Sequence, residues 1–489
     1  MTRPTLAALG PLALTVLALS GCAVGPNFHS PPAPSLSRYT PDPLPPAAGG
    51  DATRGGPDQA FAEGQDVAGQ WWTLFGSTAL DDLVARALKA NPDLAAAREA
   101  LRAAHENYLA QRGALLPAAD AGFNASRQQA SSTPAPPLAS NNDLFTLYTA
   151  QLTISYVPDL FGGVRRQVET TKAQADAQRF EAEATYLTLT TNVVAGAIQE
   201  GSLAGQIQAT RHVIRAESEL LEILRRQKAL GQVGGVDVAN QESALAQAEA
   251  TLPPLEKQLA QQRDQLAYLT GRAPSEAGEA PLDLAGLTLP ATLPVSLPSK
   301  LVEQRPDIRA AEANLHAATA QVGVAIANRL PNVTLTADAG GASTSLSNLF
   351  SQGNGFWGLA ANVAQPIFQG GTLLHRQKAA EAALAQAREQ YRAAVLAAFQ
   401  NVADTLQALQ ADSRALAAAG RAEKSAESAL AITRRQLALG QISGPSVLLA
   451  EQAYQQALVA RLQAEAGRYA DTVALFQALG GGWWNRKDV

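Results

Sequence analysis

Eight residues of this chain occur twice, 209 positions apart, and both copies close a long segment of helical composition. Residues 225–232 read Arg-Arg-Gln-Lys-Ala-Leu-Gly-Gln, and residues 434–441 differ from them only where Leu437 replaces Lys228. In both copies a glycine, Gly231 or Gly440, follows the last apolar residue. A glycine just past a helix whose last turns are basic is typical of a helix end. Each copy therefore predicts the bend of a helical hairpin, made twice in one chain.

The segments around these bends predict very long helices. Residues 164–230 contain no proline, and about 67 helical residues span on the order of 100 Å. Such a helix has to pack against other helices to be stable, and its carboxylates Glu200 and Glu217 are expected on the solvated face. The 4-3-4-4-3 spacing of apolar residues in the second long helix resembles a coiled-coil seam. That seam comprises Tyr391, Val395, Ala398, Val402, Leu406 and Leu409.

The second half of the chain repeats the order of the first. We expect two structural repeats, 70–296 and 297–484, each with a short helix, a helix, a β-hairpin, a very long helix and a return helix. The fold class is therefore mainly α with a small β part. The expected elements are hairpins at about 119–157 and 332–367, long helices 164–230 and 372–439, return helices 237–270 and 446–479, a connection 271–296 and a polar tail 485–489.

The predicted hairpins have strands with one apolar and one polar face. From Tyr148 to Tyr156, apolar residues alternate strictly with threonine, glutamine and serine, which is a strand pattern. About ten residues per strand suits a tilted membrane-spanning strand. Four strands with an apolar outer face cannot close a barrel, and open edges are not tolerated in lipid. We therefore expect a barrel shared between copies, with eight strands from two chains or twelve from three.

The N-terminus predicts secretion and lipid attachment. Residues 1–21 have the form of a signal peptide, and Leu19-Ser20-Gly21-Cys22 matches the lipobox of bacterial lipoproteins. The favoured interpretation is cleavage before Cys22 and a covalent lipid on its thiol; the alternative is a buried free cysteine after an ordinary signal peptide. Ala23 in the next position favours the outer membrane. Residues 22–69, rich in Pro and Gly, are expected to form an extended, lipid-anchored segment.

Composition argues against several other functions. The net charge of −5 disfavours a nucleic-acid partner, and the single cysteine excludes an internal disulfide or a cysteine-cluster metal site. The five histidines are scattered singly, and no nucleophile, phosphate-loop or metal motif is present. Gly353-x-Gly355-x-x-Gly358 precedes a predicted strand instead of opening a helix, so it predicts a turn. We expect neither enzymatic activity nor a cofactor beyond the lipid on Cys22.

Taken in order, the motifs resemble the outer membrane factors of tripartite efflux and type I export systems, the TolC-like channels, in their lipidated drug-efflux branch. The resemblance runs from about Trp71 to Trp484. It implies a homotrimer with a twelve-stranded barrel in outer-membrane lipid and a helical barrel in the periplasm. It also implies passive export of small toxic compounds, with a periplasmic adaptor and an inner-membrane pump as partners. The motifs that carry it are Gly25-Pro26-Asn27-Phe28, Asp159-Leu160-Phe161-Gly162, Leu297-Pro298-Ser299, Arg305-Pro306-Asp307-Ile308, Arg329-Leu330-Pro331, Gln365-Pro366-Ile367-Phe368 and Ala478-Leu479-Gly480-Gly481-Gly482-Trp483.

The resemblance implies that the bends form a periplasmic tip, where the adaptor docks and the channel closes. Family members often carry aspartates beyond the second bend, but this chain has Ser446 and Leu449 there and keeps Asp237 after the first bend. An acidic gate at Asp237 and a partly apolar gate at Leu448 or Leu449 are both open, and Asp237 could also cap its helix. The tip and docking candidates are Arg225, Arg226, Gly231, Arg434, Arg435 and Gly440, whose arginines either pair across helices or complement helix C-termini.

Two other functions remain as alternatives at this point. One is a lipid-anchored periplasmic coiled-coil scaffold or adaptor without a pore, and the other is an outer-membrane channel for type I protein secretion. The tryptophan pairs Trp71-Trp72 and Trp483-Trp484 are expected to pack within the helical body, with a lipid interface as the alternative.

Overall fold

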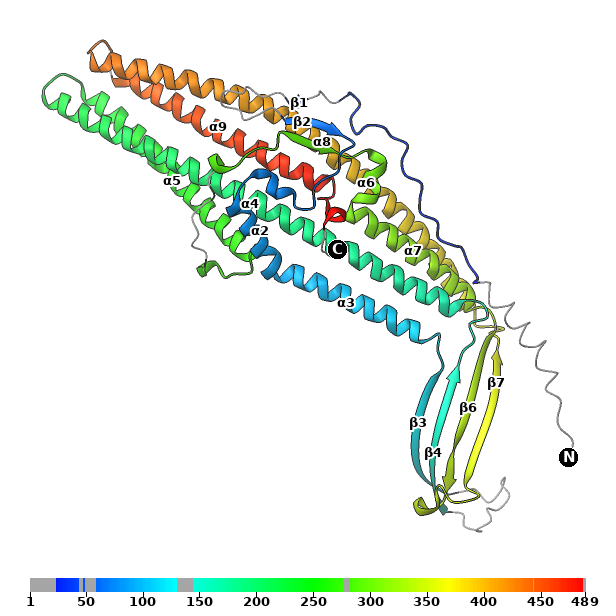
Figure 1. Cartoon of the computed structure of the whole chain (residues 1–489). Helices are drawn as coiled ribbons and strands as arrows, with labels where there is room; N and C mark the ends of the chain where they lie inside the picture. Colours follow the sequence, from blue (N-terminus) through cyan, green and yellow to red (C-terminus); the bar gives the residue numbers. More distant parts are fainter. Residues whose placement is uncertain are drawn as a thin grey trace. The chain divides into compact units, whose positions relative to one another are not determined.

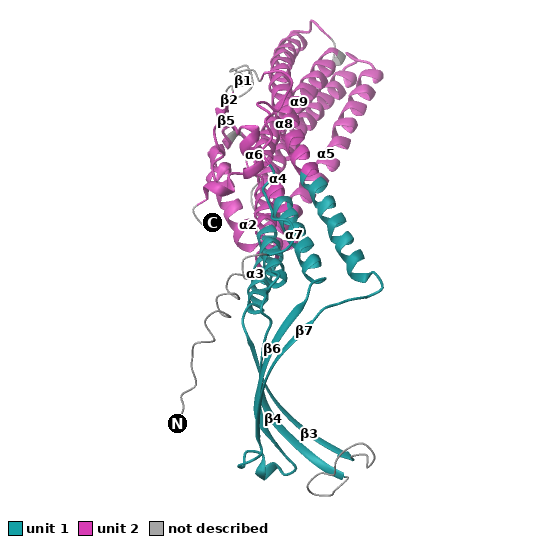
Figure 2. Ribbon diagram, turned by 90° about the vertical axis from the view of Figure 1, so that its right-hand side faces the viewer, with its two compact units in different colours: residues 1–31, 100–178, 311–391 teal, residues 32–99, 179–310, 392–489 magenta. Residues whose placement is uncertain are grey.

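The computed structural model describes residues 23–43, 47–48, 59–129, 144–276, 282, 284–442 and 444–486. The expected signal peptide and Cys22 lie outside the described residues. The chain divides into two compact units (Figure 2): unit 1 comprises residues 1–31, 100–178 and 311–391, and unit 2 comprises 32–99, 179–310 and 392–489. Each unit takes segments from both halves of the sequence, so the expected repeats, 70–296 and 297–484, are not separate compact bodies.

The two halves contain matching helices and strands (Figure 1). Both long helices, α4 and α8, have 67 residues. Among the described residues, no helix is both long enough and apolar enough to span a membrane. The first half contains the 3-10 helix η2 (Trp71–Phe75), α2 (Thr78–Ala90), α3 (Pro92–Gly113), β3 (Ala118–Gln129), β4 (Leu144–Tyr156), α4 (Gly163–Ala229) and α5 (Gly235–Leu269). The second contains α6 (Pro298–Gln304), α7 (Pro306–Ala327), β6 (Asn332–Ser343), β7 (Gly355–Ala364), α8 (Thr372–Ala438), α9 (Gly444–Ala478) and η6 (Trp483–Asn485).

Unit 1 contains the four expected strands as one antiparallel sheet in the order β3-β4-β6-β7. The register places apolar residues opposite apolar ones and polar residues opposite polar ones. Ile154 lies opposite Ala337, and Thr153 lies opposite Asp338. Thr153 Oγ1 donates a hydrogen bond of 2.6 Å to Asp338 Oδ1 on the polar face. The other face exposes large apolar side chains, including Trp357 (77%) and Leu359 (76%). The expected mainly α fold with a small two-faced sheet is confirmed.

A second, smaller sheet was not expected from the sequence. Strand β2 (Gln59–Glu63) pairs with β1 (Ala47–Ala48) and, in parallel, with β5 (Thr292–Val295). The expected extended segment 22–69 and connection 271–296 therefore meet in unit 2. These strands are short and lie next to prolines, so their sequences show no alternation of apolar and polar residues. They form because they pair with segments far away in the sequence. The first described residues of the expected polar tail pack against the protein. The Arg486 guanidinium lies 3.9 Å from the centroid of the Tyr186 ring.

The tryptophans expected to pack within the helical body do so in unit 2, where Trp71 and Trp72 are buried and Trp483 and Trp484 are half-buried. Trp71 is 1% exposed, stacks on Phe476 at 5.2 Å, and meets Trp72 edge to face at 5.8 Å. Trp483 Nε1 donates a 2.7 Å hydrogen bond to the Gln304 carbonyl. The packing interpretation of the tryptophan pairs is confirmed. The expected seam of α8 is buried too, with Ala398, Val402, Leu406 and Leu409 at 0% and Tyr391 and Val395 at 8%.

A carboxyl pair between α8 and α9 predicts a pH-dependent stability. Burial, and then the hydrogen bond and charge of Asp412, raise the pKa of Asp471 to about 7. The folded state therefore holds this proton more tightly than the unfolded chain does, so the stabilisation is full below pH ~4 and is lost as pH rises through about 7. Because the group is only half-buried, we expect a loss on the order of 1–2 kcal/mol between pH 4 and 8. In Asp412→Asn, the free energy of unfolding measured with denaturant should depend less on pH than in wild type. An unchanged pH dependence would contradict the role of Asp412 in raising the pKa of Asp471.

Candidate functional site at the hairpin ends

Both helix ends after the repeated octapeptide have the same backbone geometry. Gly231 has φ +73° and Gly440 has φ +70°, in the left-handed region that favours glycine. The Gly231 N–H donates to the carbonyl of Lys228 at 2.9 Å, and the Gln232 N–H donates to that of Gln227 at 2.9 Å. Gly440 and Gln441 repeat both bonds at 2.9 Å. This pair of bonds is the Schellman motif, which ends a helix by satisfying its last carbonyls. The two bends lie at the same end of unit 2 (Figure 1).

One arginine of each pair bridges its hairpin. Arg225 pairs with Glu242 on α5 at 2.9 Å, and Arg434 pairs with Glu451 on α9 at 2.5 Å. Both pairs join residues 17 positions apart. Arg226 and Arg435 are exposed in the last turns of their helices, where a cation complements the helix C-terminus. Both interpretations of the arginines therefore apply. The first arginine of each pair, Arg225 or Arg434, pairs across helices, and the second, Arg226 or Arg435, complements a helix C-terminus.

The environments of the two ion pairs differ. The side chains of Arg225 and Glu242 are about half exposed, at 51% and 50%. The side chain of Glu451 is only 7% exposed, and its Oε2 has no hydrogen-bond partner among the described residues. A solvated pair contributes about 0–1 kcal/mol, whereas a buried carboxylate depends on its cation. The second hairpin therefore depends on its arginine far more than the first does.

A second carboxylate, Glu217 of α4, lies close to the Arg434–Glu451 pair. It is 2% exposed and accepts a hydrogen bond from the side chain of Gln241. Burial raises the pKa of Glu217, and the Glu451 charge adds to this rise, while the hydrogen bond from Gln241 and the charge of Arg434 oppose it. The expectation that Glu200 and Glu217 are solvated is wrong. Both are buried, and Glu200 pairs with Arg263 at 2.9 Å.

All four helices meet in one apolar cluster near the bends. Val238 of α5 and Val447 of α9 are 6% and 3% exposed and occupy equivalent positions in the two copies. Sequence reasoning did not single out either valine, although the 209-residue offset relates them. The cluster joins the two hairpins into one packed end, and its other buried members are Leu220, Leu221, Leu224 and Leu430.

The gate candidates lie beside this cluster in different environments. Asp237 is half-buried, and its Oδ2 accepts a 3.0 Å hydrogen bond from the Gly234 N–H, so it caps α5. Ser446 is exposed, Leu448 is half-buried, and Leu449 is 68% exposed. Asp237 therefore caps its helix, which is compatible with a role in gating, and Leu449 presents an apolar side chain at the surface.

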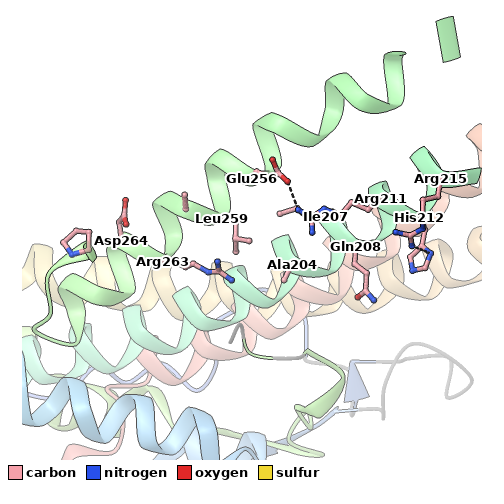
Figure 3. Close-up of a pocket in the computed structure, with 12 residues that line it drawn as sticks. Ala204, Ile207, Gln208, Arg211, His212, Arg215, Glu256, Leu259, Arg263 and Asp264 are labelled. Carbon is pink, nitrogen blue, oxygen red and sulfur yellow. Dashed lines mark hydrogen bonds and ion pairs between the residues drawn. The ribbon is translucent and has the colours of Figure 1, made fainter. Parts of the chain in front are cut away.

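The groove between α4 and α5 in Figure 3, of about 790 Å³, has charged residues on both walls. Arg211 and Glu256 join its two sides at 2.7 Å, and the Arg215 guanidinium lies 2.7 Å from His212 Nδ1. No group of three or more metal-ligating side chains occurs in the described part of the chain. The Arg211–Glu256 ion pair therefore bridges the two sides of the groove.

Known proteins resemble the whole of this arrangement. The family model described as outer membrane efflux protein matches residues 83–272 and 297–481. This chain belongs to the outer membrane efflux protein family. The pyoverdine export outer membrane protein OpmQ of Pseudomonas aeruginosa is 31% identical over 419 residues, covering 85% of this chain and 87% of its own. The probable outer membrane lipoprotein SilC of Salmonella typhimurium is 26% identical, over 96% and 97% of the two chains.

A solved structure of the outer-membrane channel OprN is similar in fold, with a TM-score of 0.83. It is 25% identical in sequence, and the match covers 94% of this chain and 100% of that one. The function of this efflux family member is that of an outer-membrane channel of tripartite efflux pumps, and its location is the outer membrane. By their names, OpmQ is an export protein, OprN is a channel and SilC is a probable lipoprotein.

Proposed function

We propose that three copies of this efflux protein form one passive conduit across the outer membrane and periplasm. Its helical tips are closed at rest and opened by a periplasmic adaptor and an inner-membrane pump. The conduit performs no catalysis of its own. The observation that supports the proposal is the sheet of unit 1, which has one exposed apolar face and one polar face, and whose edge strands have no further partner in the described part of the chain.

The strand directions favour closure between copies. Successive strands in the order β3-β4-β6-β7 are antiparallel, so the edge strands β3 and β7 run in opposite directions. Strand β7 of one copy can therefore pair antiparallel with β3 of the next, and a ring of copies leaves no edge open. The strands have 10–13 residues, which suits a tilted span of a bilayer. Three copies give twelve strands, the number that the family resemblance implies.

The tip geometry favours an apolar gate over an acidic one. The Asp237 carboxylate accepts a hydrogen bond from the backbone at the start of its own helix. The exposed Leu449 has no such contact among the described residues. We propose that Leu449, with Leu448 and Ser446 beside it, lines the closed end. The bends at Gly231 and Gly440, with the exposed Arg226 and Arg435, form the surface offered to the adaptor.

The proposed cargo is a class of small compounds. This proposal is supported by the relative OpmQ, which is named for export of pyoverdine. Deleting the gene should increase susceptibility to toxic small molecules and raise their accumulation in cells, and restoring it should reverse both. A scaffold without a pore predicts no change in accumulation, and a type I secretion channel predicts loss of an exported protein instead.

The proposed lipid on Cys22 gives a direct prediction. Cys22→Ala removes the only cysteine and therefore the only thiol that could be acylated. We expect radioactive palmitate to label the wild-type chain and to leave the variant unlabelled. Labelling retained in the variant would contradict lipidation at this residue. Since a single acyl chain anchors only marginally, two or three chains on one residue would be needed for stable membrane attachment.

A further inference from the structure

The motif Gly25-Pro26-Asn27-Phe28, which begins three residues after Cys22, has no part in the proposed conduit or its gate. In unit 1, residues 23–30 lie against the turn that precedes α4 and against α4 and α7 themselves (Figure 1). The Val24 N–H donates a 3.0 Å hydrogen bond to the Phe161 carbonyl. At Gly162, an added Cβ would lie 2.5 Å from the Ala23 Cα, so only glycine admits this approach. Two motifs 137 positions apart, counted from Gly25 to Gly162, therefore meet in the fold.

Arg166 of α4 holds the peptide through three groups. Its Nε donates to the Val24 carbonyl at 3.1 Å, and one terminal nitrogen donates to Asn27 Oδ1 at 2.6 Å. The other terminal nitrogen pairs with Glu169 at 2.7 Å. The arginine is 4% exposed. The terminal nitrogen that binds Asn27 also lies 3.5 Å from the Gly25 carbonyl, so three groups of the N-terminal peptide accept bonds from this guanidinium.

His316 of α7 completes the contact. Its ring stacks on Phe28 with centroids 4.3 Å apart and planes 12° from parallel, and its Nε2 lies 2.8 Å from Glu169 Oε1. Ser30 hydrogen-bonds to Glu312 one turn earlier on the same helix. Burial raises the pKa of Glu169, but hydrogen bonds from His316 and Arg166 outweigh this and lower it overall. The carboxylate is therefore held ionised between the two helices.

We propose that Phe161, Gly162, Arg166, Glu169 and His316 form a binding site, the anchor seat, for the peptide Ala23–Ser30. The seat fixes the chain next to the end of strand β4, and so limits how far the lipid on Cys22 can reach. If residues 22–69 were unattached and flexible, their root-mean-square reach would be roughly 35–40 Å. Seating the first residues removes that freedom and holds the acyl chains beside the membrane end of the barrel. This role of the seat rests on the proposed lipidation.

A pair of glycine variants tests the seat without altering its side chains. Gly25 has φ +91°, and an added Cβ would lie 2.5 Å from the Gly323 Cα, so Gly25→Ala both strains the peptide and pushes it off α7. Gly64 has φ +79° with nothing within 4 Å, so Gly64→Ala introduces similar strain without a clash. Hydrogen exchange of residues 23–31 would be followed by mass spectrometry in the full-length, membrane-embedded protein.

We expect the Val24 amide, which donates to the Phe161 carbonyl, to be protected in wild type and Gly64→Ala, and to exchange at least tenfold faster in Gly25→Ala. Phe28→Ala, which removes only the ring stack, should accelerate its exchange about threefold to fivefold. A wild-type Val24 amide that exchanges at the unprotected rate, or protection unchanged in Gly25→Ala, would overturn the seat. Palmitate labelling should persist in all these variants. An unlabelled wild-type chain would refute lipidation and the anchoring role, while the exchange data would still decide whether the peptide is seated.

Discussion

Replacing Arg434 with methionine is expected to loosen the hairpin tip by about 2–3 kcal/mol, the range for a lost hydrogen bond to a buried charged group. The substitution leaves Glu451 buried with neither oxygen paired among the described residues, next to the buried Glu217. A loss of this size should accelerate hydrogen exchange of the tip amides about 30-fold to 150-fold. If the tip is the gate, the same variant should also conduct ions more often in a bilayer.

The repeat supplies the matched control. Arg225→Met removes the equivalent arginine of the first hairpin, but its partner Glu242 is half-exposed and water replaces the lost bond. The expected acceleration of exchange is therefore less than about fivefold. Arg434→Met combined with Glu451→Gln removes the uncompensated charge and should recover part of the loss. Equal effects of the two arginine variants would contradict a buried ion pair at the second hairpin.

Trp71→Ala is expected to destabilise unit 2 by about 3–5 kcal/mol, the range for truncating a buried aromatic side chain. Trp71 is 1% exposed and contacts Trp72, Phe75 and Phe476, so the cavity has rings on several sides. The expected result is a lower denaturant midpoint and less folded protein in membranes. Trp71→Phe retains most of the ring contacts and should lose less.

Leu74→Ala is the control within the same short helix η2. Leu74 is 42% exposed, so its truncation should cost less than about 1 kcal/mol. Similar losses for Trp71→Ala and Leu74→Ala would show that the helix tolerates truncation anywhere, and that the aromatic cluster does not stabilise the body.

Local patterns in the sequence predict most of the fold. The bend at Gly231 follows from a rule of helix ends, and α4 is found at Gly163–Ala229 where 164–230 was expected. The face of β4 follows from strict alternation, and the register with β6 preserves it. These features depend on neighbours in the sequence, so a repeated pattern is enough to place them.

Features that depend on long-range contacts were missed. Strands β2 and β5 lie more than 220 residues apart and have no local signal, because each is stabilised by the other. Glu217 has an ordinary helical sequence around it, and only the packing of α5, α8 and α9 reveals it as buried. The equivalent valines Val238 and Val447 could have been found from the repeat, since the same offset that relates the bends relates them.

Conductance of the purified assembly in a planar bilayer tests the central proposal most directly. Copies that close a shared barrel should assemble with the mass of three chains and give discrete conductance steps, with longer openings for Arg434→Met than for Arg225→Met. A protein that stays a single chain and gives no steps would contradict the conduit and favour a lipid-anchored scaffold.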